Sequence, residues 1–184
     1  MDRFAQYLTR HIKKQNPNLS EIEVLKIQFG FECLFNELSK TIMYLFIFYF
    51  FHLTQNLIVV MLFFGSLRIF AGGLHASTYW RCFFLTLAIY STAIVLAINI
   101  VPNNIYKIII FILCIVLLYI YSPADHPNKP IISNKRRRNM KYLSLVVFPT
   151  LFVIALFLPS ILSSTAIYTL LFECISLPLS KYTI

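Results

Sequence analysis

Long apolar runs are the feature that most restricts what this sequence can fold into. They cover residues 36–51, 57–70, 83–101, about 104–121, 142–158 and 161–177. A membrane-spanning helix needs roughly 17–25 mainly apolar residues. Hydrophobic residues make up 59% of the chain, whereas soluble domains are about 45–50% apolar. The sequence therefore predicts an all-α polytopic membrane protein with about six transmembrane helices, forming a single membrane-embedded domain over residues 1–184.

Residues 1–40 are more polar and predict two amphipathic helices before the first span. Apolar side chains recur at helical spacing over 2–16, with basic residues between them, and the Asn-Pro-Asn sequence at 16–18 ends this helix. Ser20 is suited to cap the second helix, and Glu21 in its first turn suits the helix dipole. We expect both helices to lie on a membrane surface that carries anionic lipid.

The basic residues predict how the chain is oriented in the membrane. The segments 1–40, 68–82, 122–141 and 178–184 contain 15 of the 16 lysines and arginines, and only Lys107 falls near an opposite turn. Because positive charge concentrates in cytoplasmic loops, both termini are expected in the cytoplasm. The net charge of +9 is explained by topology and lipid contact, so it does not indicate a nucleic-acid partner.

The segment 68–82, "RIFAGGLHASTYWRC", carries the residues best suited to chemistry. Gly72 and Gly73 allow positive φ and are expected to end one helix, while Ser77 or Thr78 caps the next. Cys82 would then lie near the end of the first turn of that helix. His75 would lie in the turn, from which it can fold back towards the thiol. A cysteine nucleophile needs such a base, so the segment predicts a cysteine–histidine site.

Other features of this segment admit a second interpretation. Arg68 and Arg81 add positive potential that favours a thiolate and can bind a substrate carboxylate. A histidine and a cysteine seven residues apart also occur by chance, and polar residues are common where a helix meets the headgroups. The four cysteines of the chain lack paired spacing, so we expect no metal site and no cofactor.

Three segments carry a resemblance to a known family. Arg68, Gly72, Gly73, His75, Ala76 and Cys82 match the signature of the accessory gene regulator protein B (AgrB) family, in which a cysteine follows Gly-Gly-x-His-Ala seven residues after the histidine. The segment "YSPADHPNKPI" at 121–131 resembles the Pro-Ala-rich loop of that family, and "GFE" at 30–32 is a weaker match. Only Lys129 stands directly before Pro130, whereas the family more commonly has several lysines there.

The resemblance implies an activity. Members of this family are endopeptidases of the bacterial cell membrane that process the precursor of a quorum-sensing autoinducing peptide. Carried over, Cys82 is the nucleophile and His75 the base, facing the cytoplasm. Cys82 would remove the C-terminal tail of the precursor and hold the rest as an acyl-thioester, from which a thiolactone or lactone ring forms. The implied partners are a precursor with an amphipathic leader and an acidic tail, membrane lipids and a second copy of the chain.

Three further residues have two interpretations each. Asp125 is positioned to orient His75, as the third member of a triad does, or it is a turn residue beside a proline. Glu32 either faces the site or is solvated. Lys129 and the basic residues up to 141 either pair with the acidic tail or serve topology alone.

Two non-enzymatic functions compete with the peptidase. A transporter for a small peptide is expected to carry ionisable residues inside its spans, and the spans 83–101 and 142–158 contain none. A membrane scaffold gives no reason for His75 and Cys82. Glu173 is unusual within a span; it is expected to reach the membrane edge, or to pair with Lys181 or across a dimer.

Overall fold

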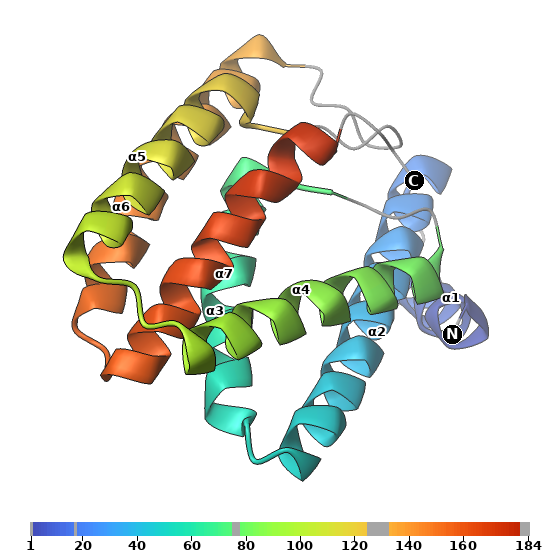
Figure 1. Ribbon diagram of the computed structural model, residues 1–184. Coiled ribbons are helices and arrows are strands. Elements are labelled where there is room, and N and C mark those ends of the chain that lie inside the picture. The colour runs from blue at the N-terminus through green and yellow to red at the C-terminus, as the bar shows by residue number, and fades with distance from the viewer. Residues whose placement is uncertain (1, 17, 75–77, 125–132, 181–184) are drawn as a thin grey trace. The chain divides into compact units, whose positions relative to one another are not determined.

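The structure, a computed structural model, describes residues 2–16, 18–74, 78–124 and 133–180, and the regular secondary structure in these ranges is helical. The helices are α1 (Asp2–Gln15), α2 (Glu21–Phe50), α3 (Thr54–Ala71), α4 (Tyr79–Asn99), α5 (Asn104–Tyr121), α6 (Asn134–Leu156) and α7 (Ser160–Leu179) (Figure 1). Over the described ranges no strand forms, and the β-type pairing is one isolated bridge between Gly72 and Ala124. The predicted all-α class is confirmed.

The chain divides into two compact units, Met1–Phe51 and His52–Ile184. In the first unit α1 packs on α2, and the rings of Phe4 and Phe35 lie 5.1 Å apart between centroids. Ser20 caps α2 as predicted: its hydroxyl accepts the amide of Glu23 at 3.3 Å. The Glu23 carboxylate accepts the Ser20 amide at 2.9 Å in return, which completes a capping box. The hydrogen bonds that the Glu23 carboxylate accepts, first from the Ser20 amide and then from the Ser20 hydroxyl, hold the pKa of Glu23 below its usual value.

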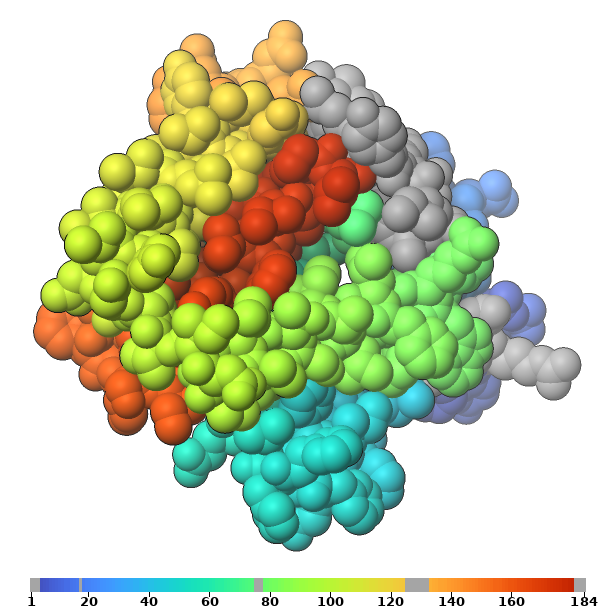
Figure 2. Space-filling view, viewed as in Figure 1, coloured from blue at the N-terminus to red at the C-terminus, as the bar shows by residue number. Residues whose placement is uncertain are grey.

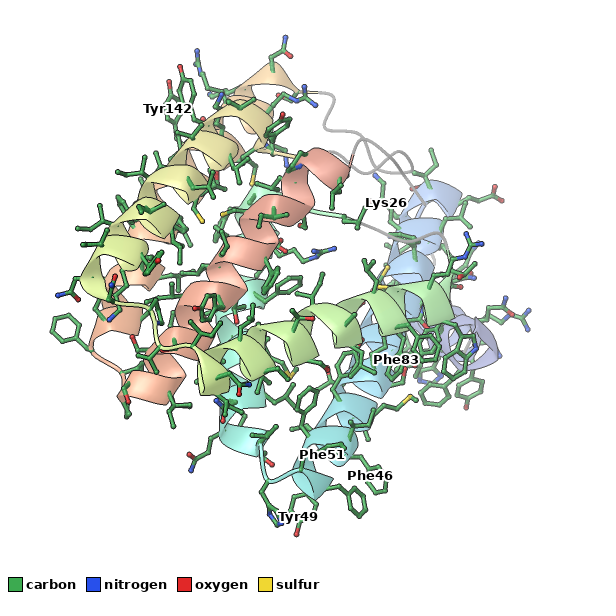
Figure 3. The ribbon with its side chains drawn as sticks, in the orientation of Figure 1. Lys26, Phe46, Tyr49, Phe51, Phe83 and Tyr142 are labelled. Atoms are coloured by element: carbon green, nitrogen blue, oxygen red, sulfur yellow. The ribbon has the colours of Figure 1, made fainter. Side chains whose placement is uncertain are left out.

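Helix α2 continues without a break into the first predicted span, 36–51. Lys40 and Glu37 form an ion pair within it. Beyond that pair, Phe46, Tyr49 and Phe51 are about two-thirds exposed and point away from the helix (Figure 3). Exposed aromatic side chains at the end of an apolar helix suit contact with lipid.

Five helices, α3 to α7, are long and apolar enough to cross a membrane. They coincide with the predicted spans 57–70, 83–101, 104–121, 142–158 and 161–177. The sixth predicted segment is helical as the end of α2, but α2 is not among the five. Its apolar part is short because Glu37 and Lys40 lie inside it.

Helix α7 is the central element of the second unit. It contacts α3, α4, α5 and α6, and it lies between α4 and α5 in both the ribbon and the space-filling view (Figures 1 and 2). Ala166, Ile167 and Leu170 of α7 are completely buried in the apolar core of this unit. Glu173, the charged residue of α7, is therefore enclosed by the helices around it.

Two polar contacts fix α7 against its neighbours. The Asn56 amide on α3 donates to the hydroxyl of Thr165 at 2.9 Å, and the Tyr168 hydroxyl donates to the carbonyl of Ile100 at 3.1 Å. Interhelical hydrogen bonds of this kind hold membrane helices in register. They set which side of α7 faces α3, where the candidate site begins.

Candidate active site

Cys82 lies in the first turn of α4, where the sequence predicted it. Thr78 is the N-cap: its hydroxyl accepts the amide of Arg81 at 3.4 Å, and its carbonyl accepts the amide of Cys82 at 3.0 Å. The side chain of Cys82 is half-buried. The thiol is thus accessible and held at the positive end of a helix, which favours a thiolate by a modest amount.

The neighbourhood of Cys82 at the start of α4 is aromatic. The indole of Trp80 stacks on the ring of Phe84 at 6.2 Å and meets Phe83 edge to face at 6.0 Å. Phe83 is labelled in this cluster (Figure 3). Aromatic rings are enriched where membrane helices meet the headgroups, and this composition is typical of such a boundary.

Gly72 ends α3 in a conformation that only glycine adopts readily. Its φ is 77° and its ψ is −152°, and its amide donates to the carbonyl of Arg68 at 3.0 Å. A Cβ at this position would lie 2.2 Å from the carbonyl oxygen of Ala124. The predicted role of Gly72 and Gly73 in ending a helix with positive φ is confirmed, since Gly73 has φ 153°.

The reason for the close approach is a backbone contact between two loops. The amide of Ala124 donates to the carbonyl of Ala71 at 2.8 Å, beside the bridge between Gly72 and Ala124. The Ser122 hydroxyl lies 2.8 Å from that of Ser144 on α6. The start of the 122–141 segment is therefore attached to the Gly-Gly turn on one side and to α6 on the other.

Arg68, in the last turn of α3, connects three parts of the chain. Its Nη1 lies 3.3 and 3.5 Å from the two carboxylate oxygens of Glu173 on α7. Its Nη2 donates to the carbonyl of Leu74, and the guanidinium lies over the ring of Phe64, 5.0 Å from its centroid. Arg68, one of the two cations that we expected to favour a thiolate, is thus paired with a carboxylate.

Glu173 is a residue of this region for which the sequence analysis assigned no function. Its side chain is fully buried, and one oxygen accepts the Ser176 hydroxyl at 3.3 Å. Among the described residues its partner is Arg68, whereas Lys181, one of the expected partners, lies outside them, and pairing across a dimer stays a prediction. An ionisable residue inside a span signals a function, but the identity of its partner depends on helix packing.

The remaining predicted site residues are His75, Asp125, Lys129 and Glu32. His75, Asp125 and Lys129 lie outside the described residues, so the pairing of Cys82 with His75 stays a prediction. Glu32 lies on α2 in the first unit, half-buried, and accepts the side-chain amide of Gln28 at 2.9 Å. Its role at the site also stays a prediction.

A basic cavity lies beside the segment that is attached to the Gly-Gly turn. It has a volume of about 570 Å³. Its lining includes Ala124, Arg137, Arg138, Lys141 and Ser180. These residues belong to the 122–124 segment, the first two turns of α6 and the end of α7. Such a cavity suits an anionic group, because each cation there can donate charge-assisted hydrogen bonds.

The comparisons with known proteins agree on one family. The family model described as accessory gene regulator B matches residues 1–177. A putative AgrB-like protein of Clostridium acetobutylicum is 30% identical over 171 residues, which cover 92% of this chain and 79% of the relative. The accessory gene regulator protein B of Staphylococcus carnosus is 30% identical over 86% of this chain and 80% of its own length. That of Staphylococcus aureus strain Newman is 28% identical over 85% and 79%. No solved structure matches the chain significantly.

Proposed function

This chain belongs to the accessory gene regulator B family, and from that premise we propose that it is a membrane cysteine endopeptidase. Membership of the family implies a role in quorum sensing. The proposed substrate is the precursor of an autoinducing peptide, and Cys82 is the proposed nucleophile. The observation that carries the proposal is the half-buried thiol of Cys82 in the capped first turn of α4. It follows Gly73 by nine positions.

The reaction has two steps that share one thiol. The Cys82 thiolate attacks the carbonyl carbon of the scissile peptide bond, the C–N bond breaks, and the leaving amine takes a proton from the imidazolium of His75. The precursor remains attached as an acyl-thioester. A cysteine or serine of the precursor then attacks that thioester and gives its proton to His75, and Cys82 leaves as a thiolate. The product is a ring closed by a thioester or an ester.

The environment of the thiol supports ring closure over hydrolysis. Water would otherwise attack the acyl-thioester and release a linear peptide. Cys82 is half-buried next to an aromatic cluster, and at the interfacial depth proposed here water is less abundant than in bulk. A precursor with an amphipathic leader would lie on the same membrane surface, which raises its effective concentration at the thiol.

The proposed orientation places this chemistry in the cytoplasm. The basic residues of α6 and of the 68–82 segment face the same side under the positive-inside rule. On that side the cavity lined by Arg137, Arg138 and Lys141 would receive the acidic tail of the precursor. The attachment of Ala124 to Ala71 connects the lining of the cavity to the segment that leads to His75.

A peptide transporter is the alternative function. Glu173 is a buried carboxylate inside a span, as in many transporters, but it is paired with Arg68. A transport function would also give Cys82 no role.

A trapped intermediate distinguishes the two functions. The purified protein in liposomes is incubated with a precursor whose ring-forming residue is replaced by alanine, and the Cys82 peptide is examined by mass spectrometry. We expect a covalent adduct of the tail-less precursor on Cys82. The matched controls are Cys33→Ala, which should retain the adduct, and Cys82→Ala, which should lose both adduct and cleavage. Normal cleavage by Cys82→Ala would exclude the peptidase.

A further inference from the structure

Glu173 and Arg68 form a connected group that the proposed reaction does not use. Glu173 is completely buried within α7, and Arg68 contributes a cation from α3 that is about one-fifth exposed. The two residues are 105 positions apart in sequence. A carboxylate buried inside a membrane helix is costly unless it is paired and hydrogen-bonded. Glu173 satisfies this requirement with both Arg68 and Ser176.

The guanidinium of Arg68 has a second contact that points towards the site. While Nη1 faces Glu173, Nη2 donates to the carbonyl of Leu74. Leu74 is buried and is the residue directly before His75. The planar guanidinium fork holds both acceptors in a fixed relation. The backbone that enters His75 is therefore bonded to α7 through one side chain.

Gly73 shows how closely this backbone lies against the ion pair. A Cβ on Gly73 would lie 2.7 Å from Nη1 of Arg68 and 2.9 Å from Oε1 of Glu173. The backbone thus passes in direct contact with both charged groups. The carboxylate, the guanidinium and residues 73–74 form one packed unit, so displacement of Glu173 moves the segment before His75.

We propose that Glu173 is a positioning residue for the peptidase: it holds Arg68, and Arg68 fixes the carbonyl of Leu74, the residue directly before the proposed base His75. The inference rests on the proposed function, in which His75 is the base. Glu173 touches neither substrate nor thiol. Its effect is on the backbone that leads into the proposed base, and therefore on kcat and not on substrate binding.

The test uses Glu173→Gln, which keeps the size of the side chain and one acceptor oxygen but removes the charge. We expect kcat for tail cleavage to fall about ten- to a hundredfold, because a displacement of about 1 Å in a catalytic group has an effect of that size. KM should change less than twofold, since the cavity that receives the tail is unaltered. Arg68→Lys should behave similarly, because a single ammonium cannot reproduce the fork.

Chemical rescue separates positioning from a general structural role. Free imidazole added to His75→Ala should restore part of the cleavage, and it should also restore part of the activity of Glu173→Gln. A protein that has lost its packing would not respond. The matched control is Thr169→Val, one turn away on α7: Thr169 is equally buried, and its hydroxyl donates only to Thr165 in the same helix. Its kcat should equal that of the wild type.

The outcomes are distinct. Wild-type kcat in Glu173→Gln would overturn the inference, and so would a loss of activity that imidazole does not restore. Either result leaves the proposed function standing if Cys82→Ala and His75→Ala are inactive. If His75→Ala or Cys82→Ala cleaves normally, the proposed function itself fails.

Discussion

The amide of Ala124 donates a hydrogen bond of 2.8 Å to the carbonyl of Ala71, although the two residues are separated by more than fifty positions. This contact joins the end of α3 to the loop that precedes α6. It brings together the two sequence segments with the strongest family resemblance, the Gly-Gly turn and the Pro-Ala loop. The space beside Gly72 is filled by the carbonyl of Ala124 as a result, which leads to a specific test.

Gly72→Ala should impair processing strongly. The backbone at this position has φ 77° and ψ −152°, which costs a residue with a side chain about 1–3 kcal/mol. The new Cβ would also lie 2.2 Å from the Ala124 oxygen, so the two loops must separate. We expect the initial rate of tail cleavage in liposomes to fall at least about tenfold.

Gly65→Ala is the matched control for this change. Gly65 lies inside α3, and a Cβ there would meet nothing within 4 Å. Alanine is favoured over glycine in a helix by up to about 1 kcal/mol, so the thermal midpoint in detergent should stay equal or rise. A wild-type cleavage rate in Gly72→Ala would show that the contact between the loops has no part in processing.

Labelling of single cysteines tests the orientation. In a protein whose own cysteines are replaced, Asn103→Cys and Ser160→Cys should react with a membrane-impermeant maleimide in intact cells, because both positions are exposed at turns on the predicted outer side. Asn139→Cys, and Cys82 restored alone, should react only after permeabilisation. Reaction of Cys82 from outside would reverse the orientation and remove the active site from the cytoplasm.

Features set by local chemistry were predictable from the sequence. Ser20 and Thr78 cap helices because a hydroxyl at that position satisfies a free amide of the first turn. Gly72 ends α3 because it accepts positive φ. The five spans follow from the lengths of the apolar runs. Each of these depends on only a few neighbouring residues.

Features set by packing between distant segments were not predictable. The pairing of Arg68 with Glu173 depends on which side of α7 faces α3, and hydropathy carries no information about that rotation. Glu173 was conspicuous as a charge inside a span, but any nearby cation was an equally good partner. The contact of Ala124 with Ala71 joins backbone groups at the end of α3 and in the loop before α6. Every residue has such groups, so the sequence does not show which of them will pair.

The hydrogen bond between Asn56 and Thr165 offers a test of how α3 and α7 are paired. A double-mutant cycle of Asn56→Ala and Thr165→Val should give a coupling energy of about 0.6 kcal/mol, and not more than about 1.7 kcal/mol, as is usual between membrane helices. The free energy of unfolding is measured in lipid bicelles. Thr150→Val combined with Asn56→Ala should show no coupling, because the Thr150 hydroxyl donates only within α6. Zero coupling between Asn56 and Thr165 would contradict this register of the two helices.

The last prediction distinguishes a local anion site on α6 from the general effect of positive charge. Arg137 and Arg138 line the basic cavity, whereas Lys135 and Arg136 border a different, smaller depression. Arg137→Gln with Arg138→Gln should raise KM for a precursor with an acidic tail about three- to tenfold, as expected for the loss of two exposed ion pairs of up to about 1 kcal/mol each. The value of kcat should stay within about twofold, because neither arginine is proposed to touch the reacting atoms.

Lys135→Gln with Arg136→Gln removes the same charge from the same helix end and serves as the matched control. Its KM should stay within about twofold of the wild-type value, since these residues lie outside the cavity. The wild-type KM should rise with salt, because exposed ion pairs are screened. A precursor with glutamine in place of the acidic tail residues should abolish the difference between the two double variants. An equal rise in KM for both would mean that the basic residues act only through net charge and membrane orientation, and that the cavity does not bind the tail.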